Sequence, residues 1–155
     1  MKQIKVGIFG LGRGTAFIES ILACNGDIVA ICDKDEKLLA KYKDRYPEAG
    51  AYNNFDDFIE HEGLEAVVIA NYFHEHAPYA IRCLKAGKHV YSAVPCSISI
   101  DEIKEIEKLV RETRLTYSMG ETGFYRGPTV FCRREYAKGT FGTFTYGEAH
   151  YNHDI

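Results

Sequence analysis

The chain has 155 residues and a formal net charge of −3, from 19 Lys+Arg and 22 Asp+Glu, and 46% of its residues are hydrophobic. These values are ordinary for a globular domain. Nucleic acid is excluded as an expected partner, because no basic block is present to bind a phosphate backbone. No apolar run approaches the ~18 residues of a membrane span, and the N-terminus enters a strand-like pattern without an apolar signal segment, so we expect a cytoplasmic protein with no membrane partner.

The cysteines predict a reducing compartment. They are five in number, an odd count, widely spaced and without a C-x-x-C pair. Such spacing is typical neither of a disulfide framework nor of a zinc site. We therefore predict free thiols and no metal.

Strand-like and helix-like segments alternate from the N-terminus. Apolar spacing predicts strands at 4–9, 28–32, 51–52, 66–70, 89–91 and 115–119, and helices at 17–22, 38–46, 55–59, 77–84 and 100–113. The run 66–70 is continuously apolar, which is typical of a strand buried on both faces of a parallel sheet. Because parallel strands need crossover connections, the alternation predicts an α/β fold: a doubly wound parallel sheet of about six strands with helices on both sides.

Two helix ends carry their own signals. Gly87 follows the helix at 77–84 and suits the left-handed residue that closes helices. Before the helix at 100–113, Ser99 stands three residues ahead of Glu102, and this spacing predicts a capping box between them.

A stretch of 35 residues near the C-terminus differs in composition from the rest. Nine of the 20 Phe+Tyr and six of the 14 glycines lie between Tyr117 and Tyr151. The pattern predicts a helix at 128–137 and a single strand at 143–151, which needs a sheet supplied from elsewhere. We therefore expect one complete α/β domain at 1–120, and at 121–155 a linker helix and the first strand of a second, truncated α+β domain.

A glycine turn lies between the first strand and the first helix. Gly10 permits a tight turn, and Gly12 lets the backbone approach a pyrophosphate that rests on the helix N-terminus, as in the Rossmann type of sheet. The third glycine of that fingerprint falls on Thr15, and the neighbouring Gly14 offers a substitute. Arg13 can face a phosphate.

Asp33 stands 23 residues after Gly10, at the end of the second strand, where a carboxylate accepts hydrogen bonds from ribose hydroxyls. Its charge would repel a 2′-phosphate, so we expect NAD as the cofactor. Lys34 beside it leaves NADP open.

Two further motifs follow. Ala70-Asn71-Tyr72 ends the fourth strand and leads to His76, and Ala86-Gly87-Lys88-His89-Val90 enters the fifth. With the glycine turn and Asp33, they resemble the glucose-fructose oxidoreductase, inositol dehydrogenase and MocA-like family. There a strand ending in Ala-Thr-Pro leads to a His, and A-G-K-H-V precedes Glu-Lys-Pro. The resemblance implies a dinucleotide-binding Rossmann domain, here 1–120, followed by a domain for substrate binding and oligomerisation that is built on an open antiparallel sheet and begins at 121–155. It also implies NAD(P)-dependent dehydrogenation of sugars, cyclitols and related polyols.

The resemblance also implies the cofactor-binding positions, which in chain order are Gly10, Leu11, Gly12, Arg13, Asp33, Lys34, Asn71, Tyr72, His76, Val94, Pro95 and Glu121. The first four of these would hold the pyrophosphate, and the adenosine ribose would lie at Asp33. Asn71, Tyr72 and His76 would border the nicotinamide half. Glu121 would lie near it, after the sixth strand.

One position departs from the family. Val94 stands where Glu-Lys-Pro has a Lys that is thought to approach nicotinamide and substrate. The expected function is hydride transfer between nicotinamide and a small carbohydrate or polyol. Two alternatives stay open: redox-assisted glycoside cleavage, as in NAD-dependent glycosidases that carry Val there, and a cofactor-binding module without turnover. We name no catalytic base, and we expect a homo-oligomer formed through the C-terminal sheet.

Overall fold

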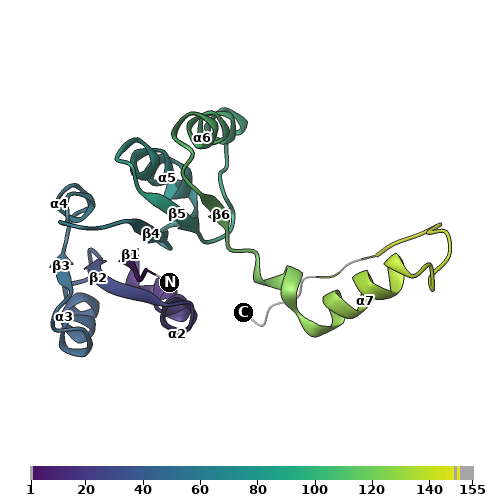
Figure 1. Ribbon diagram of the computed structural model, residues 1–155, viewed down its shortest axis with the longest axis horizontal. Helices are drawn as coiled ribbons and strands as arrows, with labels where there is room; N and C mark the ends of the chain where they lie inside the picture. Colours follow the sequence, from purple (N-terminus) through teal and green to yellow (C-terminus); the bar gives the residue numbers. More distant parts are fainter. Residues whose placement is uncertain (1, 149, 151–155) are drawn as a thin grey trace. The chain divides into compact units, whose positions relative to one another are not determined.

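The computed structural model describes residues 2–148 and 150 (Figure 1). The chain divides into two compact units, Met1–Gly120 and Glu121–Ile155.

The first unit contains a six-stranded sheet in the order β3-β2-β1-β4-β5-β6, with every neighbouring pair parallel (Figure 1). The strands are β1 (Ile4–Phe9), β2 (Gly26–Cys32), β3 (Gly50–Tyr52), β4 (Ala66–Ile69), β5 (His89–Ser92) and β6 (Tyr117–Met119). The order reverses between β1 and β4, as in doubly wound dinucleotide-binding sheets. The predicted fold class is therefore confirmed.

Helices cover both faces of the sheet. One face carries α1 (Leu11–Gly14), the 3-10 turn η1 (Thr15–Phe17), α2 (Ile18–Ala23) and α3 (Glu36–Arg45), and the other carries α4 (Phe55–Ile59), α5 (His76–Lys85) and α6 (Ile100–Thr113). A short 3-10 turn, η2 (Phe73–Glu75), precedes α5.

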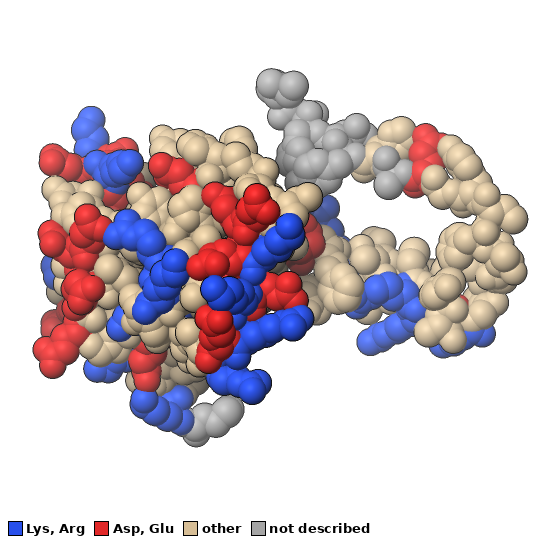
Figure 2. All heavy atoms as spheres, turned by 90° about the horizontal axis from the view of Figure 1, so that it is seen from above, with Lys and Arg blue, Asp and Glu red and all other residues tan. Residues whose placement is uncertain are grey.

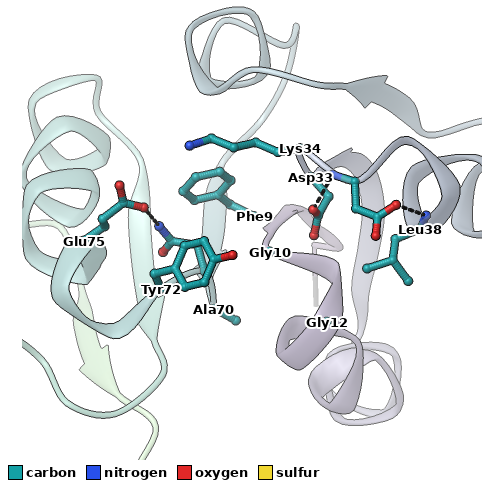
Figure 3. Close-up of a pocket in the computed structure, with 11 residues that line it drawn as sticks. Phe9, Gly10, Gly12, Asp33, Lys34, Leu38, Ala70, Tyr72 and Glu75 are labelled. Carbon is teal, nitrogen blue, oxygen red and sulfur yellow. Dashed lines mark hydrogen bonds between the residues drawn. The ribbon is translucent and has the colours of Figure 1, made fainter.

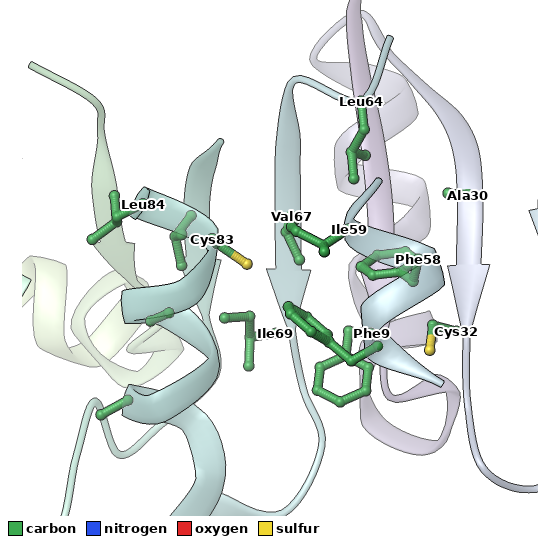
Figure 4. Close-up of a cluster of buried hydrophobic side chains, with 14 of the residues drawn as sticks. Phe9, Ala30, Cys32, Phe58, Ile59, Leu64, Val67, Ile69, Cys83 and Leu84 are labelled. Atoms are coloured by element: carbon green, nitrogen blue, oxygen red, sulfur yellow. The ribbon is translucent and has the colours of Figure 1, made fainter. Parts of the chain in front are cut away.

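Consecutive strand residues supply the two hydrophobic clusters in turn. In β1, Ile8 packs under α1 and α2, whereas Phe9 packs under α4 and α5. In β4, Val68 joins the first cluster while Val67 and Ile69 join the second, which Figure 4 shows around Phe9. This alternation follows from the two-residue period of a strand. It explains why the apolar run of β4 is unbroken and why β4 is a central strand.

The helix ends partly match the sequence signals. Gly87 has φ +76° just beyond α5, as predicted. The predicted capping box is wrong: the Ser99 side chain makes no capping bond. Instead the Ser97 hydroxyl lies 2.5 Å from Glu102 Oε2 and accepts the Ser99 N–H at 2.8 Å. The start of α6 is thus tied by a hydroxyl two residues earlier than the motif predicts.

The second unit has the 3-10 turn η3 (Thr122–Tyr125) and the helix α7 (Gly127–Ala137), close to the helix predicted there. The predicted strand at 143–151 is not formed at 143–148 or at 150, and its other residues lie outside the described part of the chain. A strand needs a partner for its backbone donors and acceptors, and the described residues of this unit supply none. Its large aromatic side chains are exposed, among them Tyr125, Phe131 and Tyr146.

Charged side chains of both signs are interspersed over the face of the first unit seen in Figure 2, and neither sign dominates there. Among the described residues, no helix is long and apolar enough to cross a membrane.

Candidate cofactor site

A cavity of about 500 Å³ opens at the carboxyl ends of β1, β2 and β4 (Figure 3). Ligands of open α/β sheets bind at this edge, where the strand order reverses. The residues that line it are Phe9, Gly10, Gly12, Asp33, Lys34, Asp35, Leu38, Ala70, Asn71, Tyr72 and Glu75. Its volume is within the range of small-molecule sites.

The glycine turn forms the floor between the two sides of the cavity. Gly10 has φ +94°, and a Cβ there would lie 2.5 Å from the Asn71 backbone nitrogen, so only glycine fits. At Gly12 a Cβ would meet nothing within 4 Å, because this position faces open space at the cavity. At Gly14 a Cβ would lie 2.7 Å from Ile8 Cγ2. Gly14 therefore provides the close helix–strand packing that the fingerprint assigns to its third glycine.

The first turn of α1 presents backbone donors. The N–H groups of Gly12 and Arg13 have no acceptor within the helix, since the helix begins at Leu11. The Leu11 N–H donates to Asp33 Oδ2 at 2.6 Å, while its side chain is buried in the core. Free N–H groups and the helix dipole together favour an anion at this turn.

The end of β2 places acidic side chains on one wall. Asp33 Oδ1 accepts the Asp35 N–H at 2.9 Å, and Asp35 in turn caps α3 by accepting from Lys37 and Leu38 N–H groups. Both carboxylates line the cavity with Lys34 between them in sequence. The wall therefore carries a net negative charge, which disfavours a second phosphate beside the ribose.

The opposite wall follows β4. Asn71 Nδ2 donates to Glu75 Oε2 at 2.9 Å. Tyr72 is 69% exposed and its ring stacks with that of His74, with centroids 6.1 Å apart. Figure 3 shows Tyr72 and Glu75 facing Asp33 and Lys34 across the cavity, with the Phe9 ring between them.

Several sequence-derived positions do not line the cavity. His76 is only 2% exposed, with Nδ1 2.8 Å from the Pro95 carbonyl oxygen and Nε2 3.2 Å from that of Asn71. Val94, beyond the end of β5, is exposed and does not line the cavity. Arg13 lies over the Phe17 ring, 5.7 Å from its centroid.

Glu121 lies in the second unit, where it accepts the Gly123 N–H at 2.6 Å. The structure thus brings together Gly10, Gly12, Asp33, Lys34, Asn71 and Tyr72 at the cavity.

Five further residues line the cavity and were not predicted from the sequence: Phe9, Asp35, Leu38, Ala70 and Glu75. Phe9 and Ala70 were identifiable as strand ends at the same sheet edge as Asp33. Glu75 belongs to no recognisable sequence motif, and it lies at the cavity because the 3-10 turn η2 ends there.

The thiol of Cys32, next to Asp33 in the sequence, is held in its neutral form. Burial, and secondly the charge of Asp33, raise the pKa of Cys32 to about 12, so it stays protonated and is a poor nucleophile. Within the residues that the structure describes, no group of three or more His, Cys, Asp or Glu is placed to hold a metal ion.

Solved structures share this fold. Scyllo-inositol dehydrogenase from Lactobacillus casei, solved with NAD(H) and scyllo-inositol, superposes with a TM-score of 0.81 at 24% identity over 91% of this chain and 43% of its own. Myo-inositol 2-dehydrogenase from Lactobacillus plantarum gives a TM-score of 0.83 at 23% identity, with the same coverage of 91% and 43%.

Curated relatives include the glycosyl hydrolase family 109 proteins of Shewanella pealeana, 27% identical, and Shewanella amazonensis, 30% identical. Each match covers all of this chain and 36% of the relative, so the chain spans about a third of their length. The family model described as the oxidoreductase family with an NAD-binding Rossmann fold matches residues 4–121. The glycine turn, the sheet order and this match together show that the chain belongs to the Gfo/Idh/MocA oxidoreductase family, of which it contains the NAD-binding Rossmann domain.

Proposed function

We propose that the chain is the cofactor-binding part of an NAD-dependent oxidoreductase that transfers a hydride between nicotinamide and a sugar, cyclitol or related polyol. The observation that carries the proposal is the shared cavity of Gly12 and Asp33: a glycine with open space at its Cβ position and a carboxylate at the end of β2. These are the two features that a dinucleotide needs from such a sheet. The polyol class is supported by the names of the two inositol dehydrogenases of the same fold.

The residues present fit a dinucleotide. The donors of Gly12 and Arg13 suit the pyrophosphate, and the open face of Gly12 lets it approach. Asp33 keeps acceptor capacity for ribose hydroxyls, because each carboxylate oxygen accepts more than the one N–H it already has. The bound nicotinamide supplies the hydride chemistry, and the chain supplies orientation. We assign no general base.

A second candidate is redox-assisted glycoside cleavage. It is favoured by Val94 in place of the family's Lys, and by the glycosyl hydrolase family 109 names of the curated relatives. Release of nitrophenol from a nitrophenyl glycoside, with catalytic NAD and without accumulation of NADH, distinguishes this reaction from net dehydrogenation.

We also propose that the protein forms a homo-oligomer and is located in the cytoplasm. The exposed aromatic side chains of the second unit, such as Tyr125, Phe131 and Tyr146, support association with further protein surface, including a homo-oligomer. All five cysteines are free, which supports a cytoplasmic, reducing location.

The test of cofactor binding is a titration of the 155-residue chain with NADH, followed by the change in nicotinamide fluorescence. We expect saturable binding that NAD displaces. No binding at millimolar NADH, with the chain folded by circular dichroism, would contradict the proposal.

A further inference from the structure

Asn71 is held from two directions at the cavity wall. Its side-chain Nδ2 donates to Glu75 Oε2 at 2.9 Å. Its backbone oxygen lies 3.2 Å from Nε2 of the buried His76, whose Nδ1 lies 2.8 Å from the Pro95 oxygen. Glu75 thus fixes the side chain of Asn71, and His76 fixes its backbone relative to the loop after β5.

The contact with Glu75 also decides which way the amide faces. A carboxylate only accepts hydrogen bonds, so Asn71 must present its NH₂ to Glu75 and its oxygen to the other side. Asn71 Oδ1 is buried and has no hydrogen-bond partner among the residues that the structure describes.

A buried acceptor without a hydrogen-bond donor destabilises the folded state, and native proteins rarely contain such a group without a functional reason. This one belongs to a side chain that lines the proposed cofactor cavity.

We propose that Asn71 is a specificity-determining residue: its Oδ1 accepts a hydrogen bond from an N–H or O–H of the bound dinucleotide, with Glu75 and His76 as positioning residues. The inference rests on the proposed function. Because Oδ1 is buried in this structure, the proposal requires a neighbouring group to move when the ligand binds, and the next residue, Tyr72, is 69% exposed. The donor is the nicotinamide carboxamide, the exocyclic amine of the adenine, or a ribose hydroxyl.

The test compares three dinucleotides by isothermal titration calorimetry. NAD carries both NH₂ groups, that of the nicotinamide carboxamide and that of the adenine. Nicotinic acid adenine dinucleotide lacks the first, and nicotinamide hypoxanthine dinucleotide lacks the second. We expect the unmodified chain to bind one of the two analogues about tenfold more weakly than NAD, the size of one lost hydrogen bond. Asn71→Leu, of similar volume but without the acceptor, should bind NAD about tenfold more weakly and lose that discrimination.

A uniform loss of about tenfold in Asn71→Leu for all three ligands assigns the donor to a ribose hydroxyl, which all three share. The melting temperature of Asn71→Leu should change little, because removal of the unpaired buried acceptor offsets the loss of the hydrogen bond to Glu75.

Glu75→Gln tests the positioning role. The new amide can accept from Asn71 Nδ2, as the carboxylate does, or donate to Asn71 Oδ1, so both orientations of the Asn71 amide become possible. We expect a loss of affinity or discrimination that is smaller than in Asn71→Leu, whereas Glu60→Gln, at an exposed site after α4, should leave all three affinities unchanged.

Two outcomes distinguish the role of Asn71 from cofactor binding itself. NAD binding that is tight and equally selective in the unmodified chain and in Asn71→Leu removes the role of Asn71 but leaves the proposed function intact. Absence of NAD binding to the unmodified, folded chain overturns the proposed function itself.

Discussion

Leu11 and Asp33, which begin α1 and follow β2, are joined by a 2.6 Å hydrogen bond from the Leu11 N–H to Asp33 Oδ2. The bond ties the glycine turn to the carboxylate across the cavity, so the two proposed cofactor contacts hold one another in place. It also uses one of the donors of the first turn, leaving those of Gly12 and Arg13 for a ligand.

Asp33→Asn tests the charge in this arrangement. The amide keeps an acceptor for Leu11 but loses the carboxylate that binds ribose hydroxyls and repels a 2′-phosphate. We expect the dissociation constant for NADH to rise about tenfold or more. The difference in affinity between NADH and NADPH should become smaller. Fluorescence titration measures both. Asp44→Asn, an exposed site on α3, should change neither value.

Substitution by alanine should have different effects at Gly12 and at Gly14. Gly12→Ala places a methyl group in open space, so stability should be kept while cofactor affinity falls. Gly14→Ala places it 2.7 Å from Ile8 Cγ2 and should destabilise the fold by about 1 to 3 kcal/mol. Urea unfolding and NADH titration of both variants check this. Equal effects of the two substitutions on binding and stability would count against the geometry described.

Ser97→Ala should destabilise α6 by about 1 kcal/mol, because Ser97 contacts Glu102 and accepts the Ser99 N–H. Ser99→Ala should cost much less, since its hydroxyl makes no capping bond. Urea midpoints of the two variants measure the difference, and a larger loss for Ser99→Ala would restore the capping box that the sequence predicts.

Cys83 should make the fold sensitive to alkali. Burial raises the pKa of this thiol to about 12, above the unfolded value of about 8.5. The folded state therefore favours the neutral thiol, so its contribution to stability is complete below about pH 8.5 and is lost progressively toward pH 12. Free energies of unfolding measured between about pH 8 and pH 11 should fall less steeply in Cys83→Ala than in the unmodified chain. Parallel slopes for the two proteins would refute this assignment.

The fold was largely predictable because its signals are local and periodic. The apolar run of β4 and the alternation of β1 follow from burial between two helical layers, and Gly87 follows from the backbone angle it must adopt. The cap of α6 was not predictable, because Ser97 and Ser99 both precede Glu102 and spacing alone does not tell which hydroxyl turns toward it. The strand at 143–151 depends on a partner strand, which no local pattern can supply.

The candidate site was predictable where a backbone requirement marks the residue. Gly10, Gly12 and Asp33 each meet a condition of turn or strand end, and the structure brings all three to one cavity. No backbone requirement identifies the role of His76 in this way. From the sequence it could contact the cofactor or lie buried between two backbone carbonyl groups, and in the structure its ring nitrogens lie near the carbonyl oxygens of Pro95 and Asn71. Glu75 lines the cavity only because η2 turns it there.

The central claim, that the cavity at the glycine turn binds NAD, is tested most directly by following the backbone amide signals of the isotope-labelled chain by NMR during a titration with NAD. We expect saturable shifts at Gly12, Arg13, Asp33 and Asn71, with none at Lys108, an exposed residue of α6. Unchanged signals at the glycine turn at millimolar NAD, or shifts confined to other parts of the chain, would contradict it.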